Sequence, residues 1–508
     1  MSSYSENNKR IARNTIALYI RMIVILVITL YTSRVILSAL GASDYGIYNI
    51  VGGIVVLFSF INTALASSTQ RFLNYEIGRG DESALKSVFN ASIHVHVLII
   101  IAIALLAETV GLWFLYAKIS IPPGRMTAAV WVYHLSVLTF CVNVFRAPFN
   151  AAIIAKEKMQ FFAYVSIVEV VLKLLIVYML LLSPIDRLVY YGCLTLGVNI
   201  VITLAYIFYC RRRFSFIVIR RRCTWESMKP LLGFSVWSCF GNISNLVSSQ
   251  GLNIVLNLFF GVTVNAAMGI ANQVSSAVFG FVGNFQTAFT PQIVQLYARD
   301  EAILFRKLIY RASKVSFFLY WIMLLPMLLN SSYILQLWLK DVPDYTNAFV
   351  QVILIDQICF ALAGPLWTAA QATGRIRNYM LVVGTLNIMT LPFAYIGLRA
   401  GLPPTSVILV KIAFDISTYV YRLFFLRRET AFAIRAYLGN ALLPICLVCL
   451  TTIPLPLLLC HYVGQGALRL CTTTALTTVT IILASYYIGM DRSERTQIVN
   501  FVKAKLKR

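Results

Sequence analysis

The chain has 508 residues, of which 59% are hydrophobic, 13% aromatic and only 12% charged. Ordinary soluble proteins are roughly 45–50% apolar and about 25% charged, so this composition excludes a water-soluble globule. Basic residues outnumber acidic ones by 43 to 19, which gives a net charge of +24. Such an excess is typical of a protein that binds nucleic acid or anionic lipid, or of the cytoplasmic edge of a membrane protein.

Long apolar segments fill nearly the whole chain. A transmembrane helix needs about 20 mainly apolar residues to cross ~30 Å of hydrocarbon. No connection between the segments is long enough to fold as a separate domain, so the predicted fold is an all-α polytopic membrane protein. The fourteen predicted spans are residues 15–38, 45–68, 88–113, 127–147, 161–182, 188–209, 233–257, 264–289, 309–329, 347–369, 379–398, 405–425, 438–460 and 469–489.

The basic residues lie mainly on one side of these spans. With the N-terminus inside, the predicted outward loops contain only Lys118, Arg125, Arg187, Lys340 and Arg399 of the 43 basic residues. This bias predicts that both termini are cytoplasmic. The first 13 residues are polar and show no small-residue cleavage pattern, so the first span is predicted to be retained.

A basic run occupies the longest connection, between the sixth and seventh spans. Arg211–Arg213 and Arg220–Arg222 bring six arginines into twelve residues. We interpret this run as a topological anchor that touches anionic headgroups of the lipid bilayer, in preference to an RNA-binding patch. The sequence therefore predicts no nucleic-acid partner.

An internal repeat divides the chain. The segment from Gly41 to Asp81 is similar in sequence to the segment from Gly261 to Asp300. The end residues are 40 positions apart in the first segment and 39 in the second. An offset of about 220 residues covers six spans, and an even number of spans restores the orientation, so the two halves are predicted to be parallel. The predicted domains are a six-helix lobe (1–210), a basic linker (211–232), a second six-helix lobe (233–425) and an extra helix pair with a basic tail (426–508).

Motifs of catalysis are missing from the sequence. It contains no Gly-rich phosphate loop followed by Lys-Ser/Thr, no His-Glu-x-x-His pattern and no Gly-x-Ser-x-Gly nucleophile motif. The ten cysteines are scattered through predicted spans, which favours packing over disulfide or metal chemistry. These absences argue against an enzyme, and the sequence predicts no cofactor or metal.

Charged residues inside apolar spans are the most informative feature. Glu169 and Lys173 lie four residues apart in the fifth span, and Lys411 and Asp415 repeat that spacing in reverse order in the twelfth. Leaving a charge against lipid costs at least about 2.5–3.5 kcal/mol, so these side chains must face a bundle interior or water. Either each acid merely neutralises its basic neighbour, or the charges bind a ligand.

The second alternative assigns separate roles to the bases and the acids. Asp356 has no basic residue three or four positions away, which favours a coupling role, whereas Arg34 is near the end of its span and could extend outward. In this interpretation the bases bind an anionic substrate and the acids carry H⁺ or Na⁺. The candidates are Arg34, Lys173 and Lys411 for the substrate, and Glu169, Asp356 and Asp415 for the coupling ion.

Amide side chains form a second set of candidates. Buried amides without partners cost several kcal/mol, so they either pair with one another or line a hydrated cavity, which would suit sugar hydroxyls. We favour the cavity, and its candidate sugar-binding residues are Gln250, Asn253, Asn272 and Gln286. One helical face of the seventh span carries Asn242, Asn245, Ser249, Asn253 and Asn257, with Gln250 beside it, and the eighth span carries Asn272, Gln273, Ser276, Asn284 and Gln286.

Several segments resemble a known superfamily. They are Leu30–Leu37 (LYTSRVIL), Leu40–Gly53 (LGASDYGIYNIVGG), Gln70–Phe72 (QRF), Pro148–Ala155 (PFNAAIIA) and Ala370–Gly374 (AQATG). The chain is similar through them to the polysaccharide-transporter branch of the multidrug/oligosaccharidyl-lipid/polysaccharide exporter superfamily. Its flippases of lipopolysaccharide biosynthesis in Gram-negative bacteria resemble it most.

The resemblance implies a V-shaped pair of six-helix lobes around a central cavity, with the extra helix pair as a groove for a polyprenyl tail. It implies translocation of undecaprenyl-diphosphate-linked oligosaccharide units for O-antigen, capsule or exopolysaccharide assembly, with a polymerase and glycosyltransferases of the same pathway as partners. The main alternative is a cation-coupled multidrug antiporter of the same superfamily. A membrane glycosyltransferase or polymerase would need a large outward lobe or an acidic catalytic loop, and a non-transporting scaffold would not need intramembrane charges.

Overall fold

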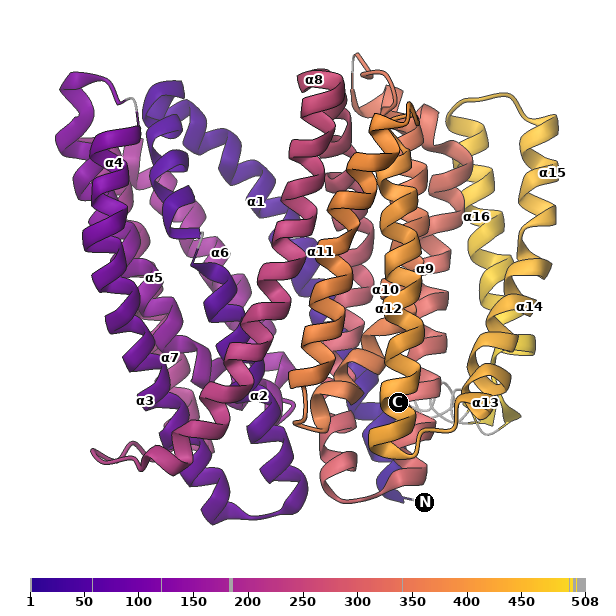
Figure 1. Cartoon of the computed structure of the whole chain (residues 1–508), viewed down its shortest axis with the longest axis horizontal. Coiled ribbons are helices and arrows are strands. Elements are labelled where there is room, and N and C mark those ends of the chain that lie inside the picture. Colours follow the sequence, from indigo (N-terminus) through magenta and orange to yellow (C-terminus); the bar gives the residue numbers. More distant parts are fainter. Residues whose placement is uncertain are drawn as a thin grey trace. The chain divides into compact units, whose positions relative to one another are not determined.

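The computed structural model describes residues 2–56, 58–119, 121–181, 186–339, 341–492, 494–496 and 499. Throughout these residues the regular structure is helical and contains no strand (Figure 1). The chain divides into two compact units, one formed by Arg13–Cys239 and the other by Phe240–Arg508 together with Met1–Ala12. The predicted all-α fold is confirmed.

The first unit, Arg13–Cys239, is built from seven α-helices and the first part of an eighth in its described residues. Helix α5 is central, because it packs against α2, α3 and α7. The elements are α1 (Ser2–Val56), α2 (Ser59–Arg79), α3 (Glu82–Leu106), which continues through a π-helical turn (Ala107–Gly111) into α4 (Leu112–Lys118), then a short 3-10 turn (Pro123–Arg125), α5 (Met126–Ala155), α6 (Met159–Leu181), α7 (Arg187–Arg213) and the start of α8.

The second unit contains the rest of α8 and all later helices. Helix α10 packs against α9 and α12, and α12 packs against α11. The elements are α8 (Trp225–Ala298), α9 (Ala302–Trp338), α10 (Thr346–Ala372), α11 (Arg377–Arg399), α12 (Ser406–Thr430), α13 (Ile434–Tyr437), a π-helical turn (Leu438–Leu442), α14 (Leu443–Thr452), α15 (Pro454–Tyr462), α16 (Ala467–Ala484) and a last π-helical turn (Ser485–Gly489).

Ten helices in the described part of the chain are long and apolar enough to cross a membrane, so the chain is a multi-pass membrane protein. This number differs from the fourteen predicted spans for identifiable reasons. Helix α8 counts once although it contains two of the predicted spans. The ten also include neither the charged helix α12 nor the predicted spans 15–38 and 45–68. The predicted count of fourteen therefore stays a prediction.

Two glycines at equivalent positions of the sequence repeat interrupt long helices in the same way. Gly41 in α1 has φ 77° and ψ 165°, and Gly261 in α8 has φ 75° and ψ −169°. This backbone conformation is essentially restricted to glycine, because in an L-amino acid the Cβ would be too close to the peptide groups on either side of the same residue. The shared conformation supports the repeat that the spacing predicts.

Helices α14 and α16 pack against α9, and polar side chains form hydrogen bonds between them. The indole Nε1 of Trp321 donates to Thr452 Oγ1 at 3.0 Å, and Asn330 Nδ2 donates to Thr473 Oγ1 at 2.8 Å. Both bonds are buried, where a neutral hydrogen bond is not in competition with water. Helices α14 and α16 are thereby attached at two levels along α9.

Candidate functional site: charged clusters in the helices of each unit

The first charged cluster joins α5 and α6 in the first unit. Glu169 accepts a hydrogen bond from Lys173 Nζ at 2.7 Å through Oε1 and one from Arg146 Nη1 at 3.1 Å through Oε2. Arg146 Nη2 donates to Asn143 Oδ1 at 2.8 Å, and its guanidinium lies 5.6 Å from the ring centroid of Tyr206. One carboxylate therefore serves two cations.

This cluster carries excess positive charge and retains access from outside. Lys173 is 40% exposed, whereas Glu169 and Arg146 are 18% and 19% exposed. The Lys173 ammonium makes one hydrogen bond within the described residues, which leaves two N–H groups for a ligand. Arg21 of α1 adds a further cation, since it interacts electrostatically with Glu169 and its guanidinium lies 4.4 Å from the ring centroid of Phe162.

The second cluster joins α10 and α12 in the other unit and has the opposite balance. Lys411 Nζ donates to Asp356 Oδ2 and to Asp415 Oδ2, the latter at 2.7 Å. Its ammonium also lies 4.9 Å from the ring centroid of Phe360. One cation therefore serves two carboxylates, and the cluster is net negative when both are ionised.

Asp356 is the most enclosed member of this second cluster. It is 2% exposed, and its Oδ1 is buried without a hydrogen-bond partner in the described part of the chain. A buried carboxylate oxygen without a donor is energetically unfavourable, and protonation or cation binding at that oxygen would remove the penalty. Asp356 has no basic residue three or four positions away in the sequence, and its partner Lys411 comes from another helix.

The sequence candidate Gln286 lies at a proline kink of α10. Pro365 has no N–H, so the carbonyl of Ala361, four residues earlier, loses its helical donor. Gln286 Nε2 supplies that donor at 3.1 Å. The space is tight, because a Cβ on Gly364 would lie 2.2 Å from Gln286 Oε1.

The two carbonyls that follow Ala361 along the kink also accept side chains from neighbouring helices. Ser313 Oγ of α9 donates to Leu362 O at 3.3 Å, and Arg422 Nη1 of α12 donates to Ala363 O at 3.3 Å. Arg422 Nε donates to Tyr379 Oη at 2.6 Å. Helices α8, α9 and α12 thus all donate to one bend in α10.

The other amide candidates lie along α8, and several of them are exposed. Asn253 Nδ2 donates to Gln250 Oε1 at 3.4 Å, while Asn253 Oδ1 is buried without a partner in the described residues. Asn272 is also exposed. In the two rows of amides and hydroxyls, the exposed members are Asn245, Ser249, Gln250, Asn257, Asn272, Gln273 and Ser276.

Arg34 lies in α1, but its side chain is outside the described residues. The structure instead places Arg146 of α5 in the first cluster, a residue that is not among the candidates named from the sequence. No local pattern links Arg146 to Glu169, because they are 23 residues apart on different helices. Their pairing depends on how α5 packs against α6.

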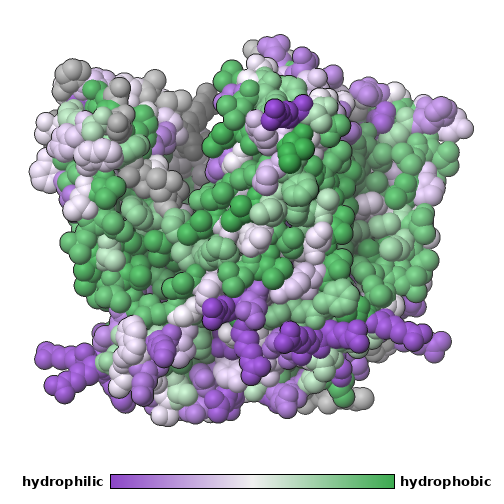
Figure 2. All heavy atoms as spheres, viewed as in Figure 1, coloured by the Kyte–Doolittle hydropathy of each residue, from purple (hydrophilic) through white to green (hydrophobic). Residues whose placement is uncertain are grey.

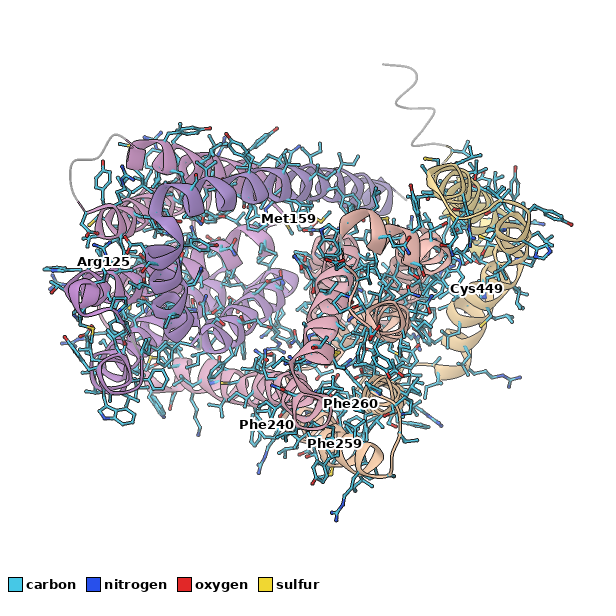
Figure 3. The ribbon with its side chains drawn as sticks, turned by 90° about the horizontal axis from the view of Figure 1, so that it is seen from above. Arg125, Met159, Phe240, Phe259, Phe260 and Cys449 are labelled. Carbon is cyan, nitrogen blue, oxygen red and sulfur yellow. The ribbon has the colours of Figure 1, made fainter. Side chains whose placement is uncertain are left out.

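A third set of charges lies at one end of the first unit, outside the spans. Arg125, labelled in Figure 3, donates from Nε to Asp44 Oδ1 at 2.8 Å and from Nη1 to Asp186 Oδ2. Burial alone would raise the pKa of Asp186, but hydrogen bonds from Arg125 and from the backbone amides of Val189 and Leu188 outweigh it, so this pKa is lowered. The hydrogen bond to Asp44 raises the pKa of Arg125.

Comparison with known proteins identifies the class of fold. A crystal structure of a mutant MATE protein matches with a TM-score of 0.73 and 14% identity over 84% of this chain and 96% of the other. An outward-facing multidrug resistance MATE transporter of the MOP superfamily matches with a TM-score of 0.70 and 16% identity, over 84% and 96% of the two chains. A MOP superfamily transporter from Pyrococcus furiosus gives 0.69 and 16%, over 85% and 96%.

The chain therefore has the fold of MATE transporters. Within it, residues 237–396 match the model of the MatE family. No curated protein sequence matches the chain.

Proposed function

We propose that the chain is a flippase that moves undecaprenyl-diphosphate-linked oligosaccharide units across the bacterial inner membrane. The observation that carries the proposal is the cluster of Glu169, Lys173 and Arg146, in which two cations share one carboxylate inside apolar helices. An excess of positive charge in a low-dielectric setting attracts an anion and repels a cationic drug. A diphosphate bears about two negative charges and would complete the neutralisation.

The proposal assigns the remaining candidates to parts of the same substrate. Lys173, with its two available N–H groups, contacts the diphosphate, and Arg34 assists it. Gln250, Asn253 and Asn272 offer amide donors and acceptors to the sugar hydroxyls. Gln286 is held at the kink of α10 and positions α8 alongside it.

The cluster of Lys411, Asp356 and Asp415 is proposed to couple transport to a cation. A proton that binds Asp356 Oδ1 removes one negative charge beside Lys411, which weakens their pairing and leaves Asp415 as the main partner. Na⁺ at the same oxygen would act in a similar way. The exchange of partners gives α10 and α12 two arrangements, which an alternating-access transporter requires.

The proposal keeps the architecture predicted from the sequence. It places fourteen spans in two six-helix lobes and a C-terminal helix pair, with the domain limits at 210, 232 and 425 and both termini in the cytoplasm. The lipid-linked glycan passes between leaflets for O-antigen, capsule or exopolysaccharide assembly, with glycosyltransferases and a polymerase acting before and after it. The chain itself transports and performs no covalent chemistry.

The Lys173→Ala variant tests this function. We expect at least a tenfold loss in the rate at which lipid-linked glycan becomes accessible on the outer leaflet, because the diphosphate loses its exposed cation. Leaflet accessibility is measured in a deletion strain that carries each variant at equal membrane abundance. Lys86→Ala is the matched control, since Lys86 also pairs with a glutamate four residues away and is 36% exposed. Full transport by Lys173→Ala would contradict the proposal.

A cation-coupled multidrug antiporter is the second candidate function. It is favoured by the net negative cluster around Lys411 and by the match of residues 237–396 to the MatE family. The Pyrococcus furiosus transporter is described as having a binding pocket of reversed polarity that suggests a different function, so charge is a useful criterion within this fold. Drug resistance that depends on Asp356, without any effect on glycan accessibility, would favour the antiporter.

A further inference from the structure

The loop between α7 and α8 is held in one conformation by buried aromatic residues. Phe216 is 2% exposed and Phe214 is 7% exposed. Phe216 packs against Phe89 with ring centroids 6.0 Å apart, and Phe214 stacks on Phe216 at 5.6 Å. The first half of the loop therefore belongs to the hydrophobic core of the first unit, although the connection contains no helix there.

Helix α3 fixes the backbone of the second half of the loop. Asn90 accepts a hydrogen bond from Arg220 N at 2.8 Å and donates to Arg222 O at 3.3 Å. His94 Nε2 lies 3.4 Å from Arg221 O, within hydrogen-bond distance. The backbone of three consecutive arginines is thus tied to one helix face, and Asn90 itself is only 6% exposed.

The arginine side chains of this loop and of the last turn of α7 are exposed. All six arginines of Arg211–Arg213 and Arg220–Arg222 are exposed, and no acidic residue occurs between positions 211 and 222. In Figure 2 hydrophilic residues gather at the lower left, where Figure 1 draws the loop before α8. The fixed backbone therefore presents a dense positive surface beside two membrane-spanning helices.

Apolar side chains accompany this positive surface. Trp225 is 61% exposed and Ile219 is 42% exposed, and both flank the second arginine triplet in sequence. An exposed indole next to basic residues is typical of the membrane–water interface, where the ring enters the headgroup layer. A soluble polyanion would leave these two apolar side chains in water, whereas a lipid surface covers them.

We propose that residues 211–225 form a preformed docking surface for anionic phospholipid headgroups of the surrounding bilayer. Clusters of four to eight basic residues next to a membrane-spanning helix attract anionic lipid, with a contribution from each residue. Asn90 and His94 are positioning residues, since they hold the loop backbone and do not contact the lipid phosphate. This surface is separate from the charged clusters within the spans.

Binding of cardiolipin to the purified full-length chain tests the proposal. Native mass spectrometry from detergent gives the bound fraction, with phosphatidylethanolamine as the neutral comparison lipid. We expect the Arg220→Gln/Arg221→Gln/Arg222→Gln variant to bind cardiolipin at least about tenfold more weakly. The control Arg427→Gln/Arg428→Gln/Arg435→Gln removes the same charge from exposed arginines of the other unit, and it should stay within about twofold of the unmodified chain.

The Asn90→Ala variant tests whether lipid binding depends on the fixed loop backbone or only on the number of positive charges. All six arginines remain, so we expect unchanged net charge but severalfold weaker cardiolipin binding, because the loop backbone is released. Equal losses in the loop variant and the control variant would overturn the proposal, as would unchanged binding in Arg220→Gln/Arg221→Gln/Arg222→Gln. Displacement of cardiolipin by a stoichiometric single-stranded oligonucleotide would also overturn it, in favour of a nucleic-acid surface.

Discussion

At the scale of single residues, the two intramembrane clusters differ in which charge is in excess. Glu169 holds two cations and Lys411 holds two carboxylates. Breaking a buried pair by removing one partner is costly, whereas the pair itself adds little stability. For this reason the proposed function assigns these charges to ligand and cation binding and not to stabilisation of the fold.

Residue-scale reasoning from the sequence found one ion pair of each cluster. The pairs Glu169–Lys173 and Lys411–Asp415 lie four residues apart, and one turn of helix brings them together. Asp356 is 55 residues from Lys411, and no local periodicity reports that distance. The sequence assigns the amides to two spans, both of which lie in α8. The hydrogen bond of Gln286 to the Ala361 carbonyl could not be predicted, because it depends on how α8 packs against α10.

The contact between Gly364 and Gln286 leads to a prediction. Gly364→Ala should destabilise the protein by about 1–3 kcal/mol, because the added Cβ would lie 2.2 Å from Gln286 Oε1 in a packed core. Thermal unfolding in detergent measures the effect. Gly283→Ala is the control, since nothing lies within 4 Å of a Cβ at that position. If the clash is the cause, Gln286→Ala should recover part of the loss in the double variant.

At the scale of elements, side chains satisfy the backbone where helices bend. Pro365 frees a carbonyl of α10, and Gln286 of α8 replaces the missing donor. The sequence shows the proline, but it does not show which helix supplies the replacement donor. The predicted span 45–68 also differs from the structure, where α1 ends at Val56 and α2 begins at Ser59.

Arg125 joins three elements of the first unit, and this predicts a pH dependence. The pKa of Asp186 is lowered in the fold, so its pairing with Arg125 stabilises the protein above the unfolded pKa of about 4 and is lost as the pH falls through the lower, folded value. Asp186→Asn should therefore reduce the melting temperature at pH 7. The difference from the unmodified protein should shrink steadily below about pH 4, and a constant difference down to pH 2 would contradict the assignment.

At the scale of the whole molecule, composition and hydropathy were sufficient to predict the all-helical membrane fold. Both composition and hydropathy are properties of the local sequence, so they do not depend on how distant segments pack. The count of spans is harder to predict, because α8 runs through 74 residues with a single break at Gly261. The attachment of the C-terminal helices could not be predicted either, since it uses isolated residues of α9 spaced over several turns.

Lys314 provides a test of that attachment. It is 2% exposed and donates to Gly489 O at 3.1 Å and to Glu494 Oε2 at 2.9 Å. Lys314→Ala leaves Glu494 without its cation and should destabilise the protein by about 3–5 kcal/mol. Limited proteolysis should then cleave first between α12 and α13. Lys307→Ala is the control, because Lys307 is also in α9 but is exposed. This variant should leave the cleavage pattern unchanged.

The bends at Gly41 and Gly261 have a consequence for the energetics of the two repeats. Both glycines adopt a conformation that L-amino acids avoid, yet nothing lies within 4 Å of a Cβ built on either one. Glycine is thus required by the φ and ψ angles of the residue itself and not by contact with neighbouring helices. Replacing either glycine by alanine would place a methyl group in open space, yet it would still destabilise the fold by about 1–3 kcal/mol. In each repeat this restriction comes from one pair of φ and ψ angles.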